Sequence, residues 1–125
     1  MEGKYKNMIF NIILFDDFET LDVFGPIEIF GRNKNHQINY YSLNGGQVIS
    51  AQGLEVNTSP IVQADPFSVL VIPGGIGTRK LISDTIFLKA LYDMASTATY
   101  CLSICTGSAV LAKAGVLDGK KATSN

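Results

Sequence analysis

The chain has 125 residues, of which 46% are hydrophobic and 17% charged, and its formal net charge is −1. This length accommodates one domain with one hydrophobic core. The basic residues do not cluster, so the composition argues against a nucleic-acid-binding function, which needs a basic surface.

The first predicted element is a strand over the apolar run at residues 8–15. It is far shorter than a membrane span and is followed by acidic residues rather than by a small-residue cleavage site, so we expect neither a membrane helix nor a signal peptide. A helical pattern follows over residues 19–33, in which Gly25-Pro26 predicts a kink. Its apolar side chains recur at intervals of three, at Leu21, Phe24, Ile27 and Phe30.

The middle of the chain, residues 37–59, is punctuated by turn residues at 44–46 and 52–53. These signals predict a strand and a hairpin. The next apolar run, at residues 68–75, is continuous rather than alternating, as is typical of a strand covered on both faces in a parallel sheet.

The last third of the chain predicts a helix over residues 84–97, with Asp84 as its N-cap, then a strand over 99–105. The apolar face of this helix carries Phe87, Leu88, Leu91 and Met94. A further helix over 107–119 is stopped by Gly115, and residues 119–125 resemble the entry into another strand.

The predicted order β-α-β-β-β-β-α-β-α indicates one α/β domain with a largely parallel sheet, helices on both faces and a small antiparallel hairpin. Because the pattern stops inside a new strand, we expect residues 1–125 to be the N-terminal two-thirds of that domain.

Three strand ends carry residues suited to chemistry, and such ends gather at one edge of a parallel sheet. Cys105 lies where the strand at 99–105 gives way to small residues, so it is either a nucleophile on a sharp strand-to-helix turn or a buried apolar cysteine. On such a turn, the helix N-terminus is expected to lower the pKa of the thiol. Cys101, in mid-strand, is expected in the core.

At the second strand end, Gly74 and Gly75 either expose backbone N–H groups to an oxyanion or simply form a tight turn. The glycines do not match a nucleotide-binding motif, because Lys80 stands where the last glycine would be. We therefore expect no nucleotide cofactor.

The first strand end carries acidic residues. Asp16, Asp17 and Glu19 suit the start of a helix, where negative charge is stabilised. Asp22 lies between two apolar residues and is either an exposed helix residue or a carboxylic acid whose raised pKa suits proton transfer to a thiolate.

The numbers of cysteines and histidines bear on whether the chain has disulfides or a metal site. Two cysteines four residues apart do not suggest a disulfide framework, and a reducing cytoplasm fits them better. His36 is the only histidine, so we expect no metal site.

The segments at residues 14–30, 69–78 and 103–123 together resemble the ThiJ/PfpI superfamily, relatives of class I glutamine amidotransferase domains. The pairing of "LDVFGPIEIF" with "ICTG" is most similar to isonitrile hydratases and to the amidase-like domains of AraC-type regulators. The resemblance implies a flavodoxin-like sandwich, a small-molecule substrate, no cofactor and a homodimer.

The resemblance also implies site roles. Cys105 matches the nucleophile, Asp22 the acid beside it and Thr106 a substrate-orienting residue, while the backbone around Gly74, Gly75 and Ile76 or the Thr106 amide would bind an anion. The protease-like branch has histidine where this chain has Thr106, which argues against a Cys-His proteolytic mechanism.

Three functions follow from this resemblance. The leading one is hydration of an isocyanide to an N-substituted formamide by a Cys105 thiolate. The alternatives are a ligand-sensing domain without catalysis and glyoxalase-like or deglycase-like chemistry on reactive carbonyls.

Overall fold

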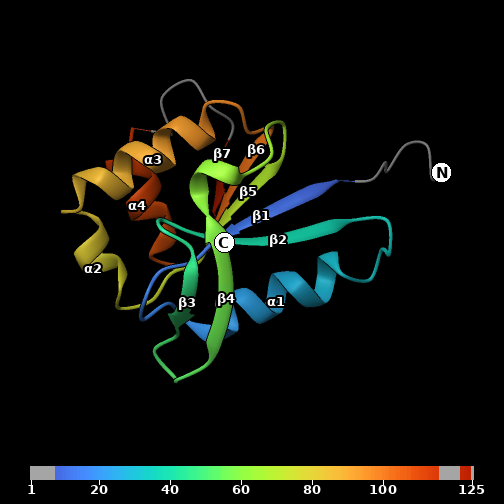
Figure 1. Ribbon diagram of the computed structural model, residues 1–125, viewed down its shortest axis with the longest axis horizontal. Coiled ribbons are helices and arrows are strands. Elements are labelled where there is room, and N and C mark those ends of the chain that lie inside the picture. Colours follow the sequence, from blue (N-terminus) through green and yellow to red (C-terminus); the bar gives the residue numbers. More distant parts are fainter. Residues whose placement is uncertain (1–7, 116–121, 125) are drawn as a thin grey trace.

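The computed structural model describes residues 8–115 and 122–124. Seven strands in this part of the chain form one sheet in the order β3-β4-β2-β1-β5-β6-β7 (Figure 1). They are β1 (Ile9–Ile13), β2 (Gln37–Ser42), β3 (Gly46–Ile49), β4 (Glu55–Pro60), β5 (Val69–Ile72), β6 (Tyr100–Ser103) and β7 (Ala122–Ser124). Every neighbouring pair is parallel except β3 and β4, which are antiparallel.

The helices lie on both faces of this sheet (Figure 1). They are α1 (Thr20–Phe30), α2 (Thr78–Leu81), α3 (Thr85–Ala95) and α4 (Gly107–Lys113), with a short 3₁₀ helix, η1 (Ile61–Gln63). From β1 the chain crosses to β2 on one side, whereas from β5 it proceeds to β6 and β7 on the other. Since parallel crossovers are right-handed, this reversal places α1 on the face opposite α3 and α4. The fold is the flavodoxin-like α/β sandwich that the sequence predicts.

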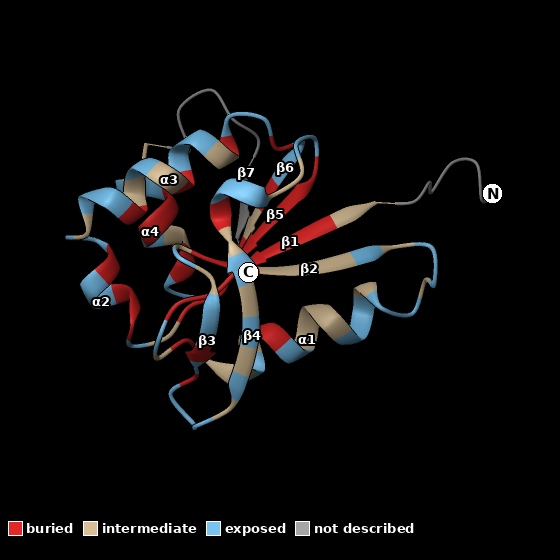
Figure 2. Cartoon of the chain, viewed as in Figure 1, coloured by how far each residue is buried: buried red, intermediate tan, exposed pale blue. Residues whose placement is uncertain are grey.

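The core lies around the two central strands, β1 and β5 (Figure 2). Ile12, Ile13 and all four residues of β5 are buried. Continuous burial is the property expected of strands covered on both faces, and it confirms the interpretation of the two apolar runs, although that of β1 includes one buried polar residue, Asn11.

The predicted helix signals after β5 are confirmed. The Asp84 carboxylate accepts a hydrogen bond of 3.0 Å from the backbone N–H of Phe87 and so caps α3. Leu91 is buried on the face of α3 that the sequence predicts. Gly115 has a φ of +83° just beyond the end of α4, although residues 116–119 lie outside the described part of the chain.

Helix α1 differs from its prediction. Leu21 and Phe24 are 72% and 52% exposed, whereas Val23 is buried. Residues three apart advance by only about 300°, so a series at intervals of three drifts around the helix instead of keeping one face. Phe30 at the other end does pack, with its ring stacked 4.0 Å from that of Phe10. The helix continues through Pro26, and two short elements, α2 and η1, were not predicted.

Candidate active site

Cys105 lies on the sharp turn between β6 and α4 that the sequence predicts. Its φ is +53°, a left-handed conformation that non-glycine residues rarely adopt, and its side chain is exposed. The turn is tight because Gly107 closely approaches β5: a Cβ at this position would stand 2.5 Å from the carbonyl oxygen of Ile72. Strained residues of this kind gather at functional sites. Cys101, by contrast, is buried in β6 as expected.

Asp22, in the first turn of α1, reaches this cysteine. Its Oδ1 accepts a hydrogen bond from the Cys105 thiol at a distance of 3.8 Å between oxygen and sulfur. Its Oδ2 accepts a second hydrogen bond, of 3.1 Å, from the backbone N–H of Gly74. One carboxylate therefore joins the ends of three elements, β5, β6 and α1, at the carboxyl edge of the sheet.

This carboxylate changes the acidity of the thiol. The negative charge of Asp22 raises the pKa of Cys105, and partial desolvation, the hydrogen bond to Asp22 and the charge of Glu19 raise it further. The predicted lowering of the thiol pKa by the helix N-terminus was therefore wrong. Helix α4 has only seven residues, whereas a charged carboxylate is in direct contact with the sulfur.

The predicted anion-binding amides are only partly available. The Gly74 N–H is bonded to Asp22, and the Gly75 N–H donates a 3.0 Å hydrogen bond to Oγ1 of Thr106. The Thr106 hydroxyl thus links the turn after β5 to the turn after β6. Within the described residues, the amides of Ile76 and Thr106 have no hydrogen-bond acceptor, so these two can receive an anionic group.

Two hollows meet at the cysteine. A cleft of about 340 Å³ is lined by Glu19, Asp22, Gly75, Ile76, Thr78, Arg79, Cys105 and Thr106. A groove of about 450 Å³ shares Asp22 and Cys105 and is otherwise lined by Leu21, Gly25, Pro26, Ile29, Phe30, Leu102 and Ile104. The thiol and its carboxylate therefore stand between a polar cleft and an apolar groove. Sequence reasoning missed Arg79, because the helix that carries it gave no pattern.

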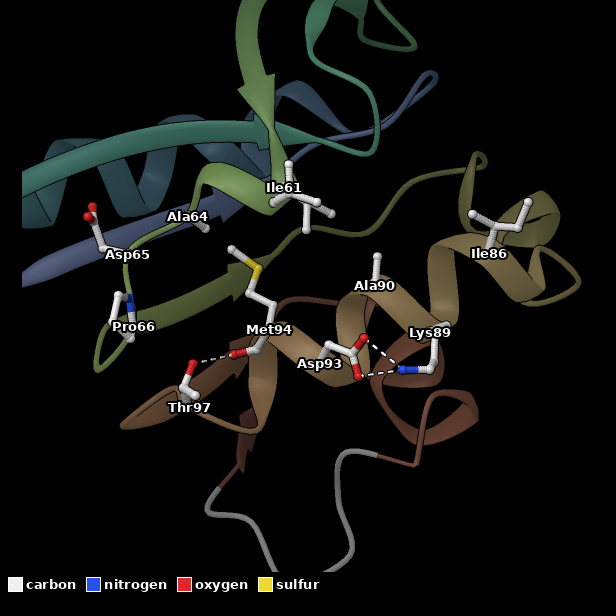
Figure 3. Close-up of a pocket in the computed structure, with 11 residues that line it drawn as sticks. Ile61, Ala64, Asp65, Pro66, Ile86, Lys89, Ala90, Asp93, Met94 and Thr97 are labelled. Atoms are coloured by element: carbon white, nitrogen blue, oxygen red, sulfur yellow. Dashed lines mark hydrogen bonds and ion pairs between the residues drawn. The ribbon is translucent and has the colours of Figure 1, made fainter.

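A separate hollow of about 380 Å³ lies between η1 and α3 (Figure 3). It is lined by Ile61, Val62, Ala64, Asp65, Pro66, Ile86, Lys89, Ala90, Asp93, Met94 and Thr97. Two of its three charged groups, Lys89 and Asp93, form an ion pair of 2.8 Å, and the third is Asp65. Its lining contains no cysteine or histidine, whereas the Cys105 cleft combines an exposed thiol with a carboxylate in hydrogen-bond contact, so we place the candidate active site at Cys105.

His36 contacts the residues at the start of β1. The Nδ1 of His36 accepts a 3.2 Å hydrogen bond from the backbone N–H of Met8, and its ring packs on Phe10. Across residues 8–115 and 122–124, no three His, Cys, Asp or Glu side chains group as metal ligands would. The same residues include no helix of the length and apolarity that a bilayer crossing requires.

Comparison with known proteins gives curated relatives with named activities, among them an isonitrile hydratase and several deglycases. The isonitrile hydratase of Pseudomonas putida is 32% identical over 114 residues, which cover 90% of this chain and 50% of that protein. A deglycase of Thermococcus kodakarensis is 29% identical over 116 residues, which cover 90% of this chain and 69% of the enzyme. The chain thus spans about half the length of the hydratase.

Solved structures agree with the fold. A ThiJ/PfpI family protein from Pseudomonas syringae superposes with a TM-score of 0.83 at 28% identity, over 90% of this chain and 48% of that one. Drosophila melanogaster DJ-1beta, at 24% identity and a TM-score of 0.74, shares the fold over 90% of this chain and 62% of its own. The sequence pattern of the DJ-1/PfpI family matches residues 10–125, and the chain belongs to this family.

Proposed function

We propose that this chain forms a cysteine-dependent active site for small molecules, and that its reaction is the hydration of an isocyanide to an N-substituted formamide. The observation that carries the proposal is the exposed Cys105 thiol, 3.8 Å from the Asp22 carboxylate on a strained turn. The similarity to the Pseudomonas putida isonitrile hydratase supports this choice of substrate.

The raised pKa of Cys105 defines the role of Asp22. A thiol that holds its proton more tightly than usual needs a base when it attacks, and Asp22 is the hydrogen-bonded acceptor. The thiol proton passes to Oδ1 of Asp22 while sulfur forms a bond to the terminal carbon of the isocyanide. The carbanion produced takes this proton back from Asp22, which leaves a thioimidate on Cys105.

Water completes the reaction. Its oxygen adds to the thioimidate carbon, and one of its protons reaches the substrate nitrogen through Asp22. The C–S bond then breaks as the remaining hydroxyl proton passes, again through Asp22, to the sulfur. The products are the formamide and the original thiol. We assign the stabilisation of negative charge during these steps to the amides of Ile76 and Thr106, which have no acceptor among the described residues.

A second candidate is deglycase-like chemistry on reactive carbonyls. It is favoured by the similarity to the Thermococcus kodakarensis deglycase. A thiol beside a carboxylate can also add to a carbonyl carbon, with Asp22 returning the proton to the oxygen. Both reactions use Cys105, so the substrate that is turned over distinguishes them.

We also propose that the protein is a homodimer with a small-molecule substrate, as the family resemblance implies. The exposed apolar side chains Leu21, Phe24 and Ile29 of α1 suit such an interface. Light scattering on the purified chain measures the mass: twice the chain mass is expected, and the mass of one chain would contradict the dimer.

The test of function compares two substrates. The purified protein is incubated separately with an alkyl isocyanide and with methylglyoxal, and product formation and substrate loss are followed by chromatography. Formamide production that is abolished by Cys105→Ala supports hydration, and loss of methylglyoxal alone would replace it with the carbonyl reaction. Inactivity on both, with a metabolite that raises the melting temperature, would instead indicate a sensor domain.

A further inference from the structure

The tip of the β3–β4 hairpin contacts the segment that leads into α1. The backbone N–H of Asp17 donates to the carbonyl of Ile49 at 2.8 Å, and that of Ala51 donates to the carbonyl of Phe18 at the same distance. In addition, Oδ1 of Asp16 accepts from the Ile49 N–H at 3.1 Å. Two parts of the chain more than 30 residues apart in sequence are therefore held together by their backbones.

The β3–β4 hairpin supplies a hydrogen-bond acceptor for the N-terminus of helix α1. The first N–H groups of a helix lack partners within the helix, and the N-cap residue of α1, Glu19, makes no capping hydrogen bond with its side chain. Instead, Oε1 of Gln52 accepts hydrogen bonds from the Thr20 backbone N–H at 3.1 Å and from the Thr20 hydroxyl at 2.7 Å. The same hydroxyl is 2.7 Å from Oγ of Ser50.

The other end of the same amide reaches the N-cap residue. The Gln52 Nε2 donates a 3.1 Å hydrogen bond to Oε1 of Glu19. One glutamine from the hairpin thus satisfies a backbone donor of α1 and fixes the side chain of its N-cap. Glu19 is in turn connected to the site, because its carbonyl accepts a 3.1 Å hydrogen bond from the Asp22 N–H.

We propose that Gln52 is a positioning residue, which caps α1 from the hairpin and holds its first turn so that the Asp22 carboxylate faces Cys105. This inference rests on the proposed role of the Cys105–Asp22 pair. The carboxylate has little freedom to compensate, since both its oxygens already contact fixed points, the Gly74 N–H and the thiol. A loosened first turn would withdraw it from one or both.

The test measures how the reactivity of the Cys105 thiol depends on pH, and it does not require turnover. Alkylation of Cys105 by iodoacetamide is measured against pH, with modification quantified on the peptide that contains this residue. Because the charge of Asp22 raises the thiol pKa, withdrawing Asp22 must lower it. Gln52→Ala is expected to move the alkylation profile to lower pH, in the direction of Asp22→Asn but less far. Gln63→Ala, at an exposed glutamine of η1, is the matched control and is expected to leave the profile unchanged.

A double variant shows whether Gln52 acts on the thiol through the position of Asp22. In an Asp22→Asn background, most of the shift caused by Gln52→Ala should disappear, because the carboxylate that Gln52 positions is gone. Gln52→Glu places a carboxylate against Glu19. Adding Glu19→Gln is expected to restore the bridging pair and to return the profile toward the original, apart from the contribution of the Glu19 charge. If isocyanide is turned over, Gln52→Ala should reduce kcat by roughly 2- to 10-fold, as for loss of one hydrogen bond.

Two results would overturn the inference. These are an unchanged alkylation profile in Gln52→Ala, whether or not its melting temperature falls, and an equal shift in the Asp22→Asn background. The alkylation readout does not depend on the substrate. Absence of isocyanide turnover would therefore refute the proposed function while leaving this test of Gln52 intact.

Discussion

Replacing Gly75 with alanine should be far more damaging than a glycine substitution elsewhere on the surface. Gly75 has a φ of +126°, and a Cβ built on it would stand 2.6 Å from the backbone nitrogen of Glu19 and 2.7 Å from the carbonyl oxygen of Asp17. Both contacts are with backbone atoms at the entry to α1, so neither can be relieved by rotating a side chain.

The magnitude follows from two contributions. The backbone conformation costs a residue with a Cβ about 1–3 kcal/mol, and overpacking against fixed atoms costs about 1–3 kcal/mol more. The expected loss of about 2–6 kcal/mol is a large part of the ~5–15 kcal/mol that stabilises a typical domain. Gly46→Ala is the matched control: its φ is +82°, yet no atom lies within 4 Å of the new Cβ, so only the conformational cost of about 1–2 kcal/mol applies.

Urea unfolding of the two variants and the original protein measures these losses directly. Gly75→Ala should lose at least about 1 kcal/mol more than Gly46→Ala, mainly because of the steric contribution. Equal losses would refute the reasoning, since they would mean that the close approach of the β5–α2 turn to α1 contributes nothing.

Three further predictions concern the site and the core. Asp22→Asn removes the charge that raises the pKa of Cys105, so the alkylation rate of this thiol should reach half its maximum at lower pH, while isocyanide turnover falls; a shift to higher pH would contradict the assigned cause. Asp84→Ala removes the N-cap of α3 and should cost about 0.5–2 kcal/mol of unfolding free energy, whereas Asp84→Asn should keep most of it, and equal losses in urea would argue against capping. Leu91→Ala should cost about 2–5 kcal/mol, whereas Ile86→Ala on the same helix, at a side chain that is 70% exposed, should have little effect; similar melting temperatures for the two would contradict the assigned core.

The sequence predicted best the features that depend on local pattern. Largely apolar runs without alternation identified β1 and β5, because a strand covered on both faces has no polar side to alternate with. Small residues after an apolar strand predicted the Cys105 turn, since only a tight connection needs Gly107 against the neighbouring strand. Asp84 was recognisable as a cap from its position relative to the helix.

Features that depend on distant partners were not predictable in this way. The pKa of Cys105 is set by Asp22, 83 residues away in sequence, and not by the helix that follows the thiol. The cap of α1 comes from Gln52, which the sequence marked only as part of a turn. Within β1, the fully buried Asn11 interrupts the apolar run because its amide donates to Ser68 and to the Asp65 carbonyl, partners supplied by the chain before β5.

The central claim is that Cys105 is the nucleophile, and the chain contains its own control in Cys101, the buried cysteine of β6. The decisive measurement is formamide production from an alkyl isocyanide by Cys105→Ala and Cys101→Ala, with mass spectrometry of the original protein during turnover. The proposal predicts no product from Cys105→Ala, product from Cys101→Ala, and an adduct of one isocyanide on Cys105. Undiminished product from Cys105→Ala would contradict it.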